Sequence, residues 1–236
     1  MNPAYTYLAV DLFCILVPFL ASFHPRIAFY KQWKFFTLPC LLTALSFLVW
    51  DYYFTKIGVW QFNPHFITGA YLLNLPIEEI LFFICIPYSC VFTYYVFRTY
   101  IKPVRNGRPF SQLALLLAIV SVTLAIFFHN KLYSSATFTF LAIGLMTAYT
   151  RKVSWLPVFF ISYTVLLIPF MISNGILTGS FIDAPVVIYN NTQNLGIRIA
   201  TIPVEDVFYG MLLFLMNVSG FELLKARHAS KLYFLK

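Results

Sequence analysis

Seven long apolar segments, separated by short polar ones, dominate the hydropathy pattern of the chain. They occupy residues 4–23, 35–54, 78–97, 111–128, 133–150, 154–173 and 206–223. Each is close to the roughly 20 residues that a helix needs to cross the hydrocarbon core of a bilayer. The pattern therefore predicts an all-α integral membrane protein with about seven transmembrane helices joined by short loops.

The positive charges alternate with these segments and indicate their direction. If all seven segments span the membrane, thirteen cations lie on one side and only Lys56, Lys131 and Arg198 on the other. The thirteen are Arg26, Lys31, Lys34, Arg98, Lys102, Arg105, Arg108, Arg151, Lys152, Lys225, Arg227, Lys231 and Lys236. Cytoplasmic loops carry the excess of Lys and Arg. We therefore expect the N-terminus outside, the C-terminus in the cytoplasm, and the protein in the inner membrane of a cell.

Composition agrees with the bilayer as the main solvent. Hydrophobic residues make up 61% of the chain and charged residues 10%, against roughly 25% charged in a typical soluble domain. The net charge of +8 does not indicate nucleic acid, because the basic residues lie in small groups between apolar segments. The four cysteines all fall inside apolar segments without the paired spacing of a zinc site, so we expect no metal.

A short acidic motif occurs twice. Residues 75–82 read LPIEEILF and residues 202–209 read IPVEDVFY, 127 positions apart, and each follows a long outer loop. We interpret the chain as a single membrane domain over 1–236. Repeat one covers about 1–100, a connecting helix about 111–128, and repeat two about 133–224. Since both motifs begin helices that enter from the same side, the two three-helix repeats run parallel, and a quasi-two-fold axis brings the motifs together near the outer face.

The motifs hold half of the eight acidic residues of the chain: Glu78, Glu79, Glu205 and Asp206. Proline followed by acids is also an ordinary helix start. However, ionisable groups at membrane depth are expensive and usually functional. Neighbouring side chains on a helix point about 100° apart, so only one acid of each motif can face a shared site. We assign proton transfer to Glu78 and Glu205, and a tuning role to Glu79 and Asp206.

Other polar and aromatic residues near the motifs are candidates for substrate binding: Asp51, Trp60, Asn63, Pro76, Pro203 and Tyr209. Asp51 lies at the outer end of its segment, close before the loop that holds Trp60. For Asp11 and Asn217, a hydrogen bond between helices is an equal alternative to a catalytic role. Aromatic rings such as those of Trp60, Tyr88 and Tyr209 can stabilise a carbocation, although most of the rings are expected to face lipid.

The elements WDYYFTKIGVWQFNP, LPIEEILFF and IPVEDVFYG together resemble the membrane-embedded lycopene cyclase family. That family occurs as two small subunits in some bacteria and as one fused chain in others, and this sequence is similar to the fused form. The resemblance implies an intramolecular lyase or isomerase that converts lycopene to β-carotene. A carboxylic acid would protonate the terminal double bond, and a carboxylate would remove a ring proton.

The resemblance implies the lipid bilayer and a carotenoid as partners, with a homo-oligomer left open. No redox cofactor is consumed, and the nine glycines contain no GxGxxG, so neither FAD nor NAD is expected. The ring type, whether β, ε or γ, also stays open.

Three other classes of membrane protein fit the sequence less well. A small seven-helix transporter has the same repeat arrangement, but the polar pathway that it needs is thin here. A retinal protein would need a lysine in the last segment, and residues 206–223 contain none. A paired-glutamate protease would show EExxxR, and Phe83 stands where the arginine belongs.

Overall fold

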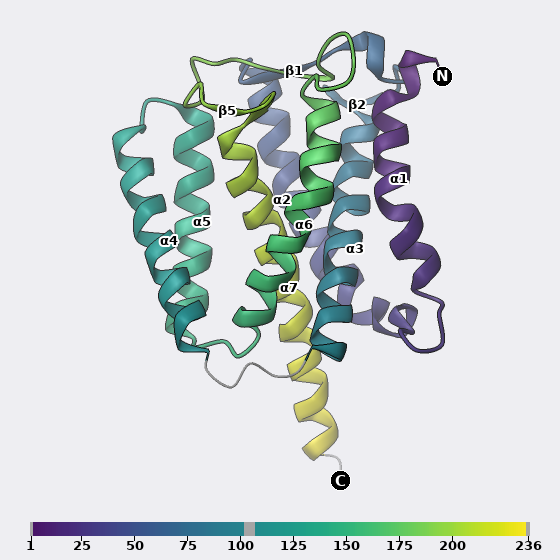
Figure 1. The fold of residues 1–236 in the computed structure, drawn as a ribbon, viewed down its shortest axis with the longest axis vertical. Coiled ribbons are helices and arrows are strands. Elements are labelled where there is room, and N and C mark those ends of the chain that lie inside the picture. Colours follow the sequence, from purple (N-terminus) through teal and green to yellow (C-terminus); the bar gives the residue numbers. More distant parts are fainter. Residues whose placement is uncertain (1, 102–106, 235–236) are drawn as a thin grey trace.

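The computed structural model describes residues 2–101 and 107–234, so three of the cations named above, Lys102, Arg105 and Lys236, lie outside the described residues. Within these ranges seven helices are long and apolar enough to cross a membrane, which confirms the predicted fold class. They are α1 (Thr6–Ala21), α2 (Trp33–Lys56), α3 (Ile77–Tyr100), α4 (Arg108–Phe127), α5 (Leu132–Thr150), α6 (Leu156–Leu177) and α7 (Val204–Phe234). The helix α1 begins at one end of the bundle and α7 ends at the other (Figure 1).

Each helix overlaps the segment predicted for it, and the largest difference is at the end of α7. The apolar pattern ends near residue 223, whereas the helix continues to Phe234. The added residues include Leu, Ala, Lys and Arg, which are good helix formers even where the sequence is no longer apolar. This last part of α7 extends beyond the other helices (Figure 1).

The helices α3 and α7, which carry the acidic motifs, form the centre of the bundle. At the periphery of the bundle, α1 packs against α3, and α5 packs against α7 in the same way. The helices α2 and α6 cross between the halves, because α2 packs against both α3 and α7, and so does α6. The connecting helix α4 packs mainly against α5. The acidic starts of α3 and α7 therefore face a common interior.

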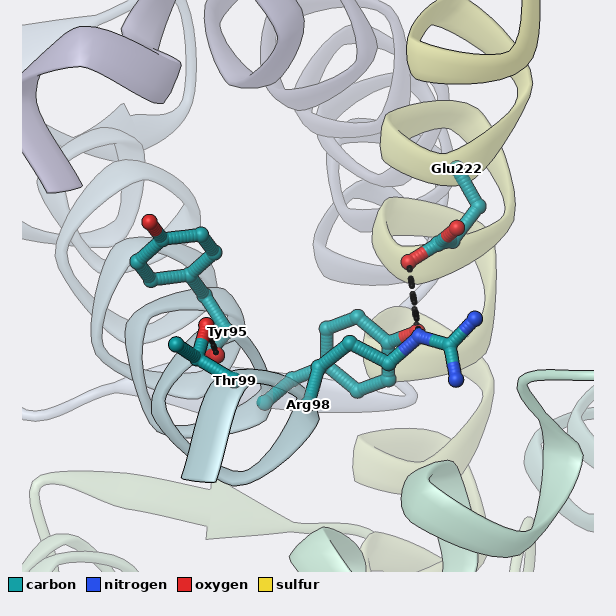
Figure 2. Close-up of polar contacts among 5 residues, drawn as sticks. Tyr95, Arg98, Thr99 and Glu222 are labelled. Carbon is teal, nitrogen blue, oxygen red and sulfur yellow. Dashed lines mark hydrogen bonds and ion pairs between the residues drawn. The ribbon is translucent and has the colours of Figure 1, made fainter. Parts of the chain in front are cut away.

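At the opposite end of the bundle, α3 and α7 are held together by a polar contact. Glu222 of α7 accepts a hydrogen bond of 2.6 Å from the Tyr94 hydroxyl and lies 3.8 Å from Nε of Arg98, both on α3 (Figure 2). Two residues before Glu222, α7 passes close to α2 at Gly220, where an added Cβ would lie 2.6 Å from Cβ of Pro39. Close helix approach over small residues is typical of membrane bundles.

Short elements shape the loops. The 3-10 helices are η1 (Pro3–Tyr5), η2 (Phe29–Gln32) and η3 (Pro64–Phe66), and the strands are β1 (Trp60–Phe62), β2 (Tyr71–Leu72), β3 (Leu75–Pro76), β4 (Val187–Tyr189), β5 (Arg198–Ile199) and β6 (Ile202–Pro203). The hairpin β2–β3 leads into α3, and the hairpin β5–β6 leads into α7. The antiparallel pair β1–β4 is centred on Gln61 and Ile188, which are 127 positions apart. We infer from this register that the two halves are duplicated units related by a local two-fold axis.

Candidate active site

A cavity of about 570 Å³ lies between the helices that carry the acidic motifs. Its volume is in the range of small-molecule sites. The lining is mostly apolar, and its three carboxyl groups, those of Asp51, Glu79 and Asp206, all lie at the same end of the bundle, near the end of α2 and at the starts of α3 and α7. Within the described part of the chain, no group of three or more His, Cys, Asp and Glu side chains is arranged to hold a metal ion.

The cavity is elongated along the bundle. On α3 its lining runs from Glu79 to Thr93, and on α6 from Leu177 down to Tyr163. Fourteen residues of helix correspond to about 21 Å, which is more than half of the roughly 30 Å hydrocarbon core of a bilayer. The carboxyl groups stand at one end of this length, and the remainder is suited to a long apolar molecule.

The second acid of each motif faces the cavity, and the first does not. Glu79 and Asp206 belong to the lining, whereas Glu78 and Glu205 are fully buried outside it. This placement does not favour the predicted use of Glu78 and Glu205 in proton transfer. The physical reason is the rotation of about 100° between successive residues of a helix, which left the sequence unable to say which acid of each pair faces inward.

Glu78 and Glu205 instead hold the loops that precede their helices. Glu78 Oε1 accepts a hydrogen bond of 2.7 Å from the backbone N–H of Thr68, and Glu205 Oε1 accepts one of 2.6 Å from that of Leu195. The two bonds are equivalent, since both span ten residues and lie 127 positions apart. Glu205 also accepts a bond of 2.5 Å from the Ser134 hydroxyl.

Glu79 shares its end of the cavity with a second carboxyl group. The carboxyls of Glu79 and Asp51 lie within hydrogen-bonding distance of each other. Tyr7 donates to Glu79 over 2.5 Å, and Tyr209 donates to Asp51 over 3.0 Å. A hydrogen bond between two carboxyl groups requires a proton on one of them. This half of the site therefore brings two carboxyl groups together next to the cavity.

Asp206 has a different environment. It accepts hydrogen bonds from Tyr133 over 2.5 Å, from Nδ2 of Asn174 over 2.7 Å and from Tyr189 over 3.0 Å. Burial raises the pKa of Tyr189, as does the negative charge of Asp206, so this loop phenol keeps its proton and stays a donor. Three donors around one carboxyl group stabilise its ionised form.

The environments of Glu79 and Asp206 contain contacts from equivalent positions of the two halves. Tyr7 and Tyr133 lie at the starts of α1 and α5, 126 positions apart, and each donates to the inward acid of its own half. Asp51 and Asn174 lie 123 positions apart, and each contacts the same acid from α2 or α6. At the end of α2 the N–H group of Val59 bonds to the carbonyl of Phe54, and at the end of α6 that of Val186 bonds to the carbonyl of Leu177. These two carbonyls are also 123 positions apart. Asn174 is thus the counterpart of Asp51.

Two predicted aromatic residues, Trp60 and Tyr209, line the cavity. Their rings lie 5.2 Å and 6.0 Å from that of Tyr133, measured between centroids, so the three form one aromatic wall. Sequence reasoning did not single out Tyr7, Tyr133, Tyr189 or Asn174. The signal that points to the first two is their equivalent place in helices one and five, which becomes visible once the repeat is aligned helix by helix.

Three predicted substrate-binding residues are absent from the lining of the cavity: Asn63, Pro76 and Pro203. Asn63 anchors its loop, since its Nδ2 donates to the carbonyl of Pro185 over 3.2 Å, and Asn190 makes the equivalent bond to Gly58 over 3.2 Å. The two prolines end the hairpins directly before α3 and α7 and are buried there.

The hydrogen bond between helices considered for Asp11 and Asn217 is not observed. Asn217 donates to the carbonyl of Leu213 within its own helix. Asp11 is fully buried, and neither of its carboxyl oxygens has a hydrogen-bond partner among the residues described. Tyr88 bonds to Ser22 and Trp33 and does not belong to the lining of the cavity.

Comparison with known proteins gives a family match over most of the chain. The family model described as lycopene cyclase matches residues 4–97 and 130–224. Among curated proteins, the chain is similar to bifunctional lycopene cyclase/phytoene synthases. The relative from Neurospora crassa is 34% identical over 99 residues, which are 42% of this chain and 15% of that protein.

The relative from Aspergillus niger is 33% identical over 61 residues, which are 25% of this chain and 10% of that protein. The relative from Pyrenophora tritici-repentis is 34% identical over 53 residues, which are 22% of this chain and 9% of that protein. The matched part thus spans between 9% and 15% of these relatives. No solved structure matches the chain.

Proposed function

Since the chain belongs to the lycopene cyclase family, we propose that it closes the ends of lycopene into β-rings, giving β-carotene by acid–base catalysis without net redox change. The observation that carries this proposal is the pair of unlike acidic environments at one end of an elongated apolar cavity. On one side stands the hydrogen-bonded pair Asp51–Glu79, and on the other stands Asp206 with three donors.

The first step is protonation. With one end of the polyene placed at the outer end of the cavity, Glu79 gives a proton to the terminal double bond, and the hydrogen bonds from Tyr7 to Glu79 and from Tyr209 to Asp51 stabilise the negative charge left on the pair. The cation that results is attacked by the nearby internal double bond, so that one carbon–carbon bond forms and the charge moves into the new ring. The rings of Trp60, Tyr133 and Tyr209 offer π faces to this cation.

The second step is removal of a proton from the ring. Asp206 accepts it, the electrons of the broken C–H bond form the ring double bond, and the positive charge disappears. One proton enters and one leaves, so the product is an isomer of the substrate. The carbon that loses its proton decides the ring type, and Tyr133, Asn174 and Tyr189 fix the position of the carboxylate relative to it.

The roles of the four motif acids thereby change from the predicted ones. In this proposal Glu79 is the acid and Asp206 the base, while Glu78 and Glu205 position the motifs through their bonds to the preceding loops. The apolar length of the cavity also argues against the transporter alternative, because a polar solute would lack partners along most of it.

The test is to produce the chain in cells that accumulate lycopene and to separate the pigments by chromatography. β-Carotene, or a carotene with one ring, should appear with the wild-type chain and be absent with Asp206→Asn. A matched control is Glu222→Gln, which removes an acid at the far end of α7. Unchanged lycopene in cells whose membranes contain the folded wild-type chain would contradict the proposal.

A further inference from the structure

We infer that the substrate enters the site sideways from the bilayer, through an opening between α1 and α6, and that the equivalent route between α5 and α2 is closed. The inference rests on the proposed function, because it takes an apolar polyene dissolved in lipid as the substrate. It adds the direction from which the end of that polyene reaches the carboxyl groups.

The exposed part of the cavity lining identifies the opening. Of all the lining residues, three are exposed at the surface of the molecule: Phe13, Pro169 and Ile172. Phe13 is 73% exposed and Ile172 57%. All three lie on α1 or α6, within the apolar spans of these helices. The cavity therefore meets the lipid-facing surface along this edge, where both helices flank α3 (Figure 1).

The four outer helices contribute very unequally to the cavity. Five lining residues come from α1 and nine from α6. Their counterparts in the other half contribute one each, Tyr133 from α5 and Asp51 from α2. A cavity shaped by the local two-fold axis alone would extend equally to both sides, so some feature must block the second side.

The blocking feature is a pair of large rings. The offset of 126 between α1 and α5 makes Phe140 the counterpart of Cys14, and the offset of 123 between α2 and α6 makes Trp50 the counterpart of Ser173. Phe140 packs against Trp50 with 5.4 Å between ring centroids. At the equivalent place, Cys14 and Ser173 are small, contact each other and line the cavity. At this position, small side chains thus leave room for the cavity on one side, and large rings fill the space on the other.

An opening at this place suits a molecule dissolved in the hydrocarbon layer. Below the contact of Cys14 with Ser173, the edge of the cavity is formed by Pro18, Ile86 and Pro169, which offer a polyene no polar barrier. The carboxyl groups lie farther in, at the outer end. With one route open, the two ends of a long substrate enter one after the other, and a product with one ring leaves the site before the second end is closed.

The experiment transfers the closed arrangement to the open side. The double variant Cys14→Phe with Ser173→Trp places the large pair between α1 and α6. Its control, Leu12→Trp with Ile168→Trp, adds bulk to exposed positions of the same two helices that do not line the cavity. Both are produced in lycopene-containing membranes. The readouts are thermal stability, the initial rate of ring formation and the lycopene that remains bound to the purified protein.

We expect the first variant to form rings about tenfold more slowly than the control, or slower, and to retain less lycopene. Ile172→Trp, at the exposed edge of the opening, should lower the rate of ring formation and the bound lycopene by a smaller amount. It replaces the double variant in the test if the double variant does not fold. Equal rates and equal bound lycopene in folded blocked and control proteins would overturn the inference. If the wild type and the control form no rings, the proposed function fails instead, and bound lycopene alone then tests the entry route.

Discussion

Asn174 stands in the second half of the molecule where Asp51 stands in the first, and each contacts the inward acid of its own half. An amide thus stands in one environment where a carboxyl group stands in the other, and Tyr189 adds a third donor to Asp206. The amide donates a hydrogen bond to Asp206, whereas the carboxyl group of Asp51 lies beside that of Glu79. The two acids therefore lie in unlike environments at one end of the cavity, which suits opposite proton-transfer roles in the proposed reaction.

Asp51→Asn should make the two halves alike and abolish most of the activity. The amide retains the size of the side chain and an oxygen that can accept the hydrogen bond from Tyr209, so folding should survive. General acid catalysis is worth about 10²- to 10⁴-fold in rate, and we expect a loss in that range. The measurement is the initial rate of lycopene loss per amount of membrane-bound protein. A rate near that of the wild type would exclude Asp51 from the acid pair.

Tyr189→Phe removes one of the three donors to Asp206 and keeps the ring. The carboxylate should be positioned less well and ionised less readily, so the rate should fall by about 10- to 150-fold, the range that corresponds to about 1.5–3 kcal/mol for a hydrogen bond to a charged group. The matched control is Tyr71→Phe, because Tyr71 is exposed on the hairpin before α3 and away from the cavity. Equal losses in both variants would show that the effect does not depend on Asp206.

Gly220→Ala tests the packing of α2 against α7. The added Cβ would lie 2.6 Å from Cβ of Pro39, a distance that the two helices can relieve only by moving apart. We expect a loss of about 1–3 kcal/mol of stability, measured as a lower melting temperature in detergent. Gly107→Ala is the control, since its Cβ would meet nothing closer than 3.8 Å. Similar melting temperatures would contradict the close approach.

The proposed orientation predicts where a label can reach. In the orientation that the distribution of cations predicts, the β1–β4 loops lie outside the cell, so a cysteine introduced at Gln61, which is exposed, should react with a thiol reagent that cannot cross membranes. A cysteine at Arg227, exposed near the end of α7, should react only after the cells are opened. The reverse pattern would invert the topology and place the carboxyl groups near the cytoplasmic face.

The sequence was sufficient to predict the features that depend on long apolar segments and on a repeated motif. It predicted seven spans and the two acidic motifs, because lipid demands long apolar helices whatever their packing. It could not choose between Glu78 and Glu79, because that choice depends on the rotation of α3 against its neighbours. The sequence also could not show that Asn63 bonds to the loop of the other half, since a polar residue near the motif can bond to a loop as well as to a substrate.

The central claim is that the second acid of the first motif donates the proton. Its most direct test compares Glu79→Gln with Glu78→Gln in lycopene-accumulating cells, with pigments measured per amount of folded protein in the membrane. Glu79→Gln should yield folded protein and unchanged lycopene. Glu78→Gln should lower stability, because it weakens the bond to Thr68, but its folded fraction should still form rings. Ring formation by Glu79→Gln, together with none by folded Glu78→Gln, would contradict the account.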